Sequence, residues 1–218
     1  TIVSDQSTAN SNWKSTDWLL KHGQSFDRII YHIGNSPFHR SIANCAQHWP
    51  GINVMHELYI GDLQNNRGRN LLFRELYQQH GYQPIHQASS SHAGLLKTLE
   101  QFPASEQLID HSLGSIVHSA DAKEQLEQLA TGAICETVPM VCKKRQLLNK
   151  VEARGTLGIA EDVILICSFG LVGEGKGSID ILKSWSCMDP ALRCKTQLVF
   201  VGKNSEGSYG HQMTKAIQ

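Results

Sequence analysis

Short runs of apolar, largely β-branched residues alternate along the chain with longer stretches in which apolar positions recur every three or four residues. The short runs predict strands, and the longer stretches predict helices between them. Strands that alternate with helices in this way are typical of an α/β fold with parallel sheets. The predicted strands are 27–33, 52–56, 115–119, 133–138, 163–170 and 197–202, and the predicted helices are 37–48, 68–80, 92–101, 120–130, 143–157 and 177–187.

Two of the predicted helices have clear start signals directly after a strand. We expect the side chain of Ser36 to cap one helix, with Pro37 in the first helical position, where its missing N–H costs nothing. Ser119 is expected to cap another helix, whose Asp121 and Glu124 lie near the positive end of the helix dipole. Both signals predict tight turns from strand to helix.

A domain boundary is expected within 139–150, where Pro139 ends a strand and a basic stretch follows. The next residues, "VEARGTLGIAEDVILICSFG", have the pattern of a helix, a turn and a buried strand. We therefore expect two domains, 1–142 and 143–218. The first lacks a strand followed by a glycine loop in its polar opening residues, and the second holds a single βαβ unit, so both are expected to be incomplete.

The net charge and the cysteine content of the sequence narrow the range of functions to be expected. Lys and Arg together number 20, as do Asp and Glu, so a neutral chain gives no electrostatic reason to expect nucleic-acid binding. The six cysteines form no C-x-x-C pair, and Cys167 lies in an apolar run, which favours a buried thiol and a reducing compartment. Without a signal peptide or a membrane-length apolar stretch, we expect a cytoplasmic protein with at most peripheral membrane contact.

Candidate chemistry lies after three predicted strands, because ligands bind at the carboxyl ends of parallel strands. The stretches are "IGNSP" (33–37), "MHE" (55–57) and "FGLVGEGKG" (169–177). In the last, glycines allow close backbone approach, and Lys176 before a helix start suits a diphosphate. Since Gly177 replaces the Ser or Thr of a Walker loop, and G-x-G-x-x-G does not fit either, an ordinary strand-to-helix turn is the alternative.

The histidines allow several interpretations. His56 ends a strand, either as a structural histidine bonded to a carbonyl or as a histidine that contacts a substrate. His32 and His39 suggest a metal, but no third ligand has zinc spacing, so we expect no metal site. No G-x-S-x-G motif occurs, which leaves an α/β-hydrolase without its nucleophile.

Four stretches together carry a resemblance that spans residues 27–202. They are "YHIGNSPFH", "PGINVMHELYIGDL", "IVHSADAKEQL" and "ILICSFGLVGEGKGSIDILKSW" with "LVFVG". Their order and spacing resemble the retaining glycosyltransferases of family 4. The resemblance implies the GT-B fold, in which two Rossmann-like domains face each other across a cleft. It also implies transfer of a sugar, with retention, from a nucleotide-sugar donor to a glycan or lipid-linked acceptor, without a metal or other cofactor.

The resemblance assigns roles residue by residue. His56 looks like the family's strand-end histidine near the donor sugar, and Lys176, with Gly170 and Gly175, looks like its donor-diphosphate loop. A lysine and a helix N-terminus would stabilise the charge that develops on the leaving diphosphate. The positions implied to line the cleft on the acceptor side are Gly34, Asn35, His39, His118 and Ser119.

Departures from the family pattern leave two alternatives open. Leu171 stands where many relatives carry an arginine, and the family's E-x7-E motif and N-terminal glycine loop are not found within the sequence. We therefore expect the chain alone to be inactive as a transferase. The alternatives are a non-catalytic binding or scaffold protein with a GT-B surface, and another GT-B sugar-phosphate enzyme such as an epimerase.

Overall fold

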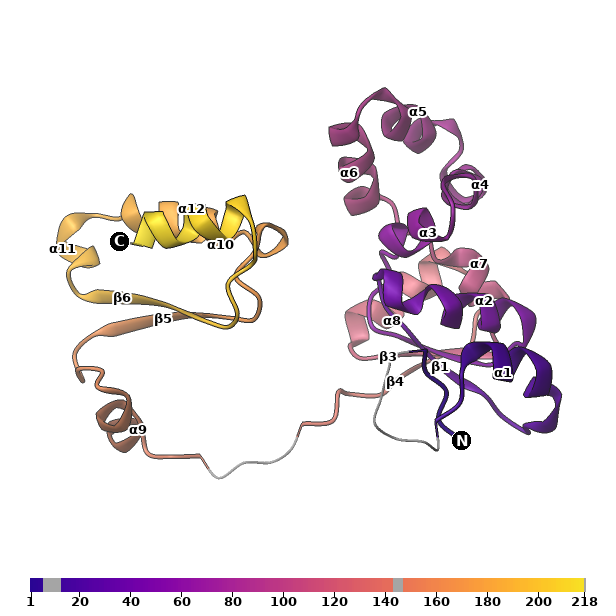
Figure 1. Ribbon diagram of the computed structural model, residues 1–218, viewed down its shortest axis with the longest axis horizontal. Helices are drawn as coiled ribbons and strands as arrows, with labels where there is room; N and C mark the ends of the chain where they lie inside the picture. Colours follow the sequence, from indigo (N-terminus) through magenta and orange to yellow (C-terminus); the bar gives the residue numbers. More distant parts are fainter. Residues whose placement is uncertain (6–12, 143–146, 218) are drawn as a thin grey trace. The chain divides into compact units, whose positions relative to one another are not determined.

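The computed structural model describes residues 1–5, 13–142 and 147–217. The chain divides into two compact units, Thr1–Cys142 (unit 1) and Lys143–Gln218 (unit 2). Each unit has its own parallel sheet, with helices between consecutive strands (Figure 1). The predicted α/β class with parallel sheets is therefore confirmed.

Unit 1 is built on a four-stranded sheet in the order β1-β2-β3-β4. All neighbours are parallel, and β1 lies at one edge. When the strands follow one another in this order, right-handed crossovers place their connecting helices on one face of the sheet. The strands are β1 (Ile30–Ile33), β2 (Ile52–Met55), β3 (Gly114–Val117) and β4 (Cys135–Thr137).

The covered face of this sheet carries the main core of unit 1. Along β1, Tyr31 and Ile33 are buried and Ile30 and His32 are exposed, so only one face is fully packed. The buried residues form one cluster with Leu19, Ala43, Leu108 and Leu126 from the covering helices. Those helices are α1 (Thr16–His22), α2 (Arg40–His48), α7 (Glu106–Asp110) and α8 (Ala120–Leu129). The opposite face is partly open, with Ile30, Ile134 and Val138 exposed.

Four helices between β2 and β3 form a separate packed group above the sheet (Figure 1). The last three of these helices share a core that contains Leu72, Leu76, Ala88 and Leu99, whereas Leu63 of the first helix belongs to the sheet core. Two of these helices match the predicted ranges 68–80 and 92–101. The group comprises α3 (Gly61–Arg67), α4 (Arg69–His80), α5 (Tyr82–Ser90) and α6 (His92–Gln101).

Unit 2 contains a two-stranded parallel sheet whose strands are far less buried than the sequence suggests. No residue of β5 is buried, and Cys167 is exposed, so the expected buried strand and buried thiol are wrong. The core, around Val172, Leu182 and Met213, is too small to enclose the strands. The elements are α9 (Lys150–Leu157), β5 (Ile164–Phe169), a 3-10 turn (Glu174–Lys176), α10 (Ser178–Ser186), α11 (Pro190–Arg193), β6 (Thr196–Val201) and α12 (Ser208–Ile217).

The predicted helix starts have mixed outcomes. Ser119 caps α8 as expected, and its Oγ accepts the Ala122 N–H at 3.1 Å. Ser36 does not cap by its side chain, because its Oγ is bonded to the His39 ring at 2.9 Å and the helix opens as a 3-10 turn over Pro37–His39. The predicted helix 143–157 begins at Lys150; its first residues, 143–146, lie outside the described ones.

Candidate functional site

The carboxyl edge of the sheet in unit 1 brings three histidines into contact. His56 directly follows β2, His118 directly follows β3, and His32 belongs to β1. His32 Nδ1 lies 3.2 Å from His56 Nε2, and His56 Nδ1 lies 3.3 Å from His118 Nε2. Neighbouring rings lie edge to edge at interplanar angles of 21° and 30°, with centroids 5.4 and 5.2 Å apart. We call these three side chains the histidine row.

The strand register explains why the histidines meet. Ile33 is paired with Met55, and Val54 is paired with Ile116, so β1, β2 and β3 end at nearly the same level. Residues one step beyond the ends of β2 and β3 therefore lie side by side, and His32 lies one residue before the end of β1. The row is closed at its far end by the Val138 carbonyl, 2.8 Å from His118 Nδ1.

The central ring is the most perturbed of the row. The pKa of His56 is lowered from its ordinary value, first by partial burial and then by the neighbouring rings of His32, His118 and His39. The Glu57 carboxylate acts in the opposite direction. His56 is therefore neutral at pH 7, and it acts there through its hydrogen-bonding nitrogens and not through a positive charge.

Asn35, expected to line an acceptor site, is largely occupied by the chain itself. Its backbone N–H donates to Glu57 Oε1 at 2.8 Å, and its Nδ2 donates to Asp62 Oδ2 at 3.2 Å. Its Oδ1 accepts the Leu63 N–H at 2.9 Å, in the first turn of α3. The side chain therefore fixes the start of α3 against the end of β1, which is a positioning role.

The neighbouring turn is built around the His39 ring. A Cβ at Gly34 would lie 3.0 Å from His39 Cε1, so a side chain there would push the ring aside. Ser36 Oγ holds the same ring through Nδ1. Gly34 and His39 therefore lie in contact at this edge, and the imidazole of His39 is close enough to affect the pKa of His56.

In unit 2, the expected diphosphate loop follows the end of β5. Gly170 has φ +114°, and Gly177, directly before α10, has φ +62°, so both positions favour glycine. A Cβ at Gly175 would meet no atom within 4 Å, so the packing of the protein does not require glycine there. Lys176 is exposed and forms no ion pair with any described residue.

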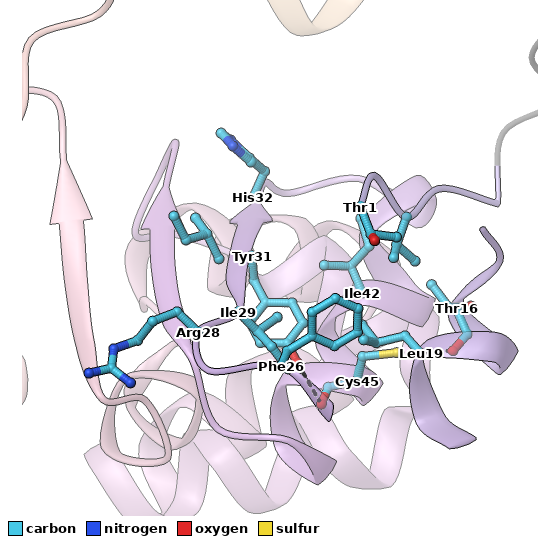
Figure 2. A pocket seen from close by; sticks show the side chains of 12 residues that line it. Thr1, Thr16, Leu19, Phe26, Arg28, Ile29, Tyr31, His32, Ile42 and Cys45 are labelled. Carbon is cyan, nitrogen blue, oxygen red and sulfur yellow. Dashed lines mark hydrogen bonds between the residues drawn. The ribbon is translucent and has the colours of Figure 1, made fainter. Parts of the chain in front are cut away.

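A cavity of about 180 Å³ lies beside the free edge of β1 (Figure 2). Most of its lining is apolar, with Leu19, Phe26 and Ile42 among the lining residues. The Tyr31 hydroxyl donates to the Trp49 carbonyl at 2.8 Å, so this polar group already has a partner. The cavity offers no set of convergent polar groups, and the candidate site is the carboxyl edge of the sheet instead.

Two kinds of feature are absent from the described residues. These residues contain no group of three or more His, Cys, Asp or Glu side chains arranged to hold a metal ion. The nitrogens of the histidine row face one another. None of the helices in the described part of the chain has the length and apolar character needed to span a bilayer.

Sequence reasoning identified His56 and His118 but missed their partners. It considered His32 only as a metal ligand with His39, whereas the structure places His32 against His56. It included Glu57 in the stretch "MHE" without giving it a role, and it missed the Val138 carbonyl. The available signal was the recurrence of a histidine near the ends of three successive strands, in "YHI", "VMH" and "IVH".

Comparison with known proteins does not assign the protein to a family. No protein-family model matches the chain, and no curated protein matches it. Inference about function therefore rests on the site geometry, together with the resemblance carried by residues 27–202.

Proposed function

We propose that the chain is part of a retaining glycosyltransferase of the GT-B type, which moves a sugar from a nucleotide-sugar donor to a glycan or lipid-linked acceptor. In this proposal unit 1 is the acceptor-side domain and unit 2 begins the donor-side domain. The protein would act in the cytoplasm, at the inner face of the membrane when its acceptor is lipid-linked. The proposal needs no metal, because the charge of the leaving diphosphate would be met by lysine and backbone N–H groups.

One observation carries the proposal. His56, the residue that resembles the family's strand-end histidine, lies at the carboxyl edge of a parallel sheet and is held from both sides by other imidazoles. Ligands of open α/β sheets bind at this edge. Both ring nitrogens of His56 are bonded to His32 and His118, so His56 would hydrogen-bond a sugar hydroxyl by exchanging one of these two bonds for it.

The loop after β5 gives further support. Lys176 offers an uncompensated positive charge, and the open space at Gly175 allows a phosphate group to approach the backbone. The Ile179 N–H, at the start of α10, already donates to the Tyr209 hydroxyl at 3.0 Å. Binding of a diphosphate would therefore depend mainly on Lys176 and the glycine-rich turn.

The proposal is tested by titrating the chain with UDP, GDP and ADP while backbone amide resonances are recorded. We expect one of the three to shift the amides of 170–178. Lys176→Ala should raise its Kd about tenfold, since one charge contact is lost. Lys183→Ala is the matched control, because Lys183 is an exposed lysine on α10 that lies 3.9 Å from Asp180.

Two outcomes contradict this assignment. One is the absence of any shift in 170–178 with all three nucleotides. The other is an equal loss of affinity in Lys176→Ala and Lys183→Ala, which would indicate a general charge effect and not a contact.

The role of His56 is tested by turnover of nucleotide sugars with the complete gene product. We expect His56→Ala to lower kcat about 100-fold, because the side chain would touch the transferring sugar. His111→Ala is the control, since His111 is exposed and its ring is bonded to the Gln107 carbonyl of the preceding helix. Unchanged turnover in His56→Ala would remove this residue from the mechanism.

A further inference from the structure

The histidine row and the Val138 carbonyl form one continuous chain of hydrogen bonds. It runs from His32 Nδ1 to His56 Nε2, from His56 Nδ1 to His118 Nε2, and from His118 Nδ1 to the Val138 oxygen. Five of the six ring nitrogens are used in this chain. Among the described residues, His32 Nε2 alone of the six has no partner, and His32 is exposed.

The Val138 carbonyl fixes the direction of every bond in the chain. A carbonyl oxygen only accepts, so His118 Nδ1 carries a hydrogen. In a neutral His118 the other nitrogen is then an acceptor, so His56 Nδ1 must donate to it. The same step repeats once more, and His32 Nδ1 donates to His56 Nε2. All three neutral rings are therefore Nδ1–H tautomers, and the free nitrogen, His32 Nε2, is a base.

The histidine row can take up one proton without losing a hydrogen bond. A proton added at His32 Nε2 leaves all three bonds intact. Shifting the Nδ1 proton of His32 to His56, and that of His56 to His118, moves the positive charge along the row while one hydrogen remains in each bond. At His118 the charge faces the Val138 carbonyl, which stabilises it.

A second proton cannot be added to the histidine row without the loss of a hydrogen bond. With His32 and His118 both charged, each must donate to His56, but a neutral His56 carries one hydrogen and can accept at only one nitrogen. One ring-to-ring bond is therefore lost, and two like charges face each other across one ring. Outside the row, the groups that act on the pKa of His56 are His39, which lowers it, and Glu57, which raises it.

We propose that the histidine row acts as a single base, which takes up one proton at His32 Nε2 from solvent or from an acidic group bound there, with His56 and His118 as positioning residues that share the charge. The bond between the proton and the acid that donates it breaks, its electron pair stays on the conjugate base of that acid, and the proton forms a new N–H bond at His32 Nε2. The proton later returns to solvent from the same exposed nitrogen. The bond geometry of unit 1 carries this inference, which goes beyond the proposed transfer reaction and does not depend on it.

The test is a titration of the imidazole nitrogens by ¹⁵N NMR between about pH 4.5 and 8.5, across the ordinary range of histidine. At high pH all three rings should be Nδ1–H tautomers. Their signals should then move together through a first midpoint, with a second midpoint about one pH unit or more below it. His22 and His111 are references in the same spectra, because each is bonded through Nδ1 to a single helix carbonyl.

Two variants examine the sharing of charge. His118→Gln keeps a hydrogen-bonding group near His56 but cannot take the proton, so the first midpoint of the row should fall by about 0.5 pH unit, a threefold loss of proton affinity. His32→Asn keeps a donor for His56 but removes the free base, and the first midpoint should fall further. His111→Gln, the control, should leave the row unchanged.

The wild-type titration alone decides the matter if a variant fails to fold. Three independent midpoints, each with full amplitude at its own ring, would overturn the proposal, as would Nε2–H tautomers at high pH. A row that titrates as expected in a protein that binds no nucleoside diphosphate would support the base and reject the transferase, so the two failures are distinguishable.

Discussion

Glu75 is a carboxyl group buried within unit 1, with only 2% of its surface exposed. Its Oε1 accepts the Gln107 N–H at 2.9 Å and Gln79 Nε2 at 3.2 Å. Burial raises its pKa from 4.5 to about 7, although the bond from Gln107 and the charge of Arg67 act against this rise. At neutral pH this residue therefore lies close to its own titration.

This raised pKa predicts the pH dependence of stability. The folded state binds the Glu75 proton more tightly than the unfolded state, so its contribution to the free energy of unfolding is full below about pH 4.5 and falls as pH rises to about 7. Glu75→Gln keeps an acceptor oxygen and never ionises. Between about pH 5 and pH 8 the variant should lose less stability than the wild type, by on the order of 2–3 kcal/mol.

Urea unfolding followed by circular dichroism at both pH values measures this difference. Glu100→Gln is the control, because Glu100 is exposed on α6 in the same helical group. If the wild type and Glu75→Gln lose stability in parallel as pH rises, the Glu75 carboxyl is not the titrating group.

The residues of the site were only partly predictable, for a reason of geometry. His56 and His118 stand at strand ends, and strand ends can be recognised from a local apolar run. The contact between His32 and His56 depends instead on the register between two strands 24 residues apart. The Val138 carbonyl is a backbone group that no residue type reveals. The roles of Lys176 and Gly175 stay predictions.

At the scale of elements, we expect glycine to have two different roles in the turn after β5, one in the fold and one in ligand binding. Gly170→Ala places a side chain at φ +114° and should destabilise unit 2 by about 1–3 kcal/mol. Gly175→Ala should change stability by less than about 0.5 kcal/mol, because its Cβ meets no atom, yet it should weaken nucleoside diphosphate binding. Thermal unfolding and ligand titration of both variants measure the two effects.

The glycine prediction fails in a recognisable way. If Gly175→Ala lowers the unfolding temperature as much as Gly170→Ala does, then Gly175 serves the fold. If it changes neither stability nor binding, no ligand approaches the backbone at this turn.

The six strands and the longer helices were predictable because each carries an unbroken apolar pattern, and all six strands are present within two or three residues of the predicted ends. Two of the helices that were missed, α5 and α12, contain residues of low helix propensity. The segment of α5 contains Pro84, and that of α12 contains Gly210. A Cβ at Gly210 would lie 1.8 Å from the Ser205 carbonyl oxygen, so tertiary packing requires a residue with low helix propensity there.

At the scale of the whole molecule, the two units are joined by a stretch whose flanks are exposed. Val141 is 99% exposed and Leu147 is 93% exposed. Thermolysin, which cleaves before large apolar residues, should therefore cut first at Val141, Leu147 or Leu148. Mass spectrometry should show two stable fragments near the boundaries of the units, and cleavage within the core of unit 1 should follow much later.

An early cut elsewhere would contradict this order. In particular, cleavage before Leu72 or Leu76, which are buried in the helical group, would show that this group opens more readily than the joint. If the loop after β5 binds a nucleoside diphosphate, addition of that ligand should slow cleavage of the loop by thermolysin.

The bond between His118 and Val138 has a practical consequence. Val138 directly follows β4, and its backbone N–H donates to the Val117 carbonyl of β3 at 2.9 Å. The same residue sets which nitrogen of His118 carries hydrogen. The tautomer of His118, which can be read from its ¹⁵N shifts, therefore reports whether the segment at Val138 keeps its place beside the sheet. The ¹⁵N shift of one His118 ring nitrogen would therefore detect movement of the chain at Val138, without a fluorescent or spin label.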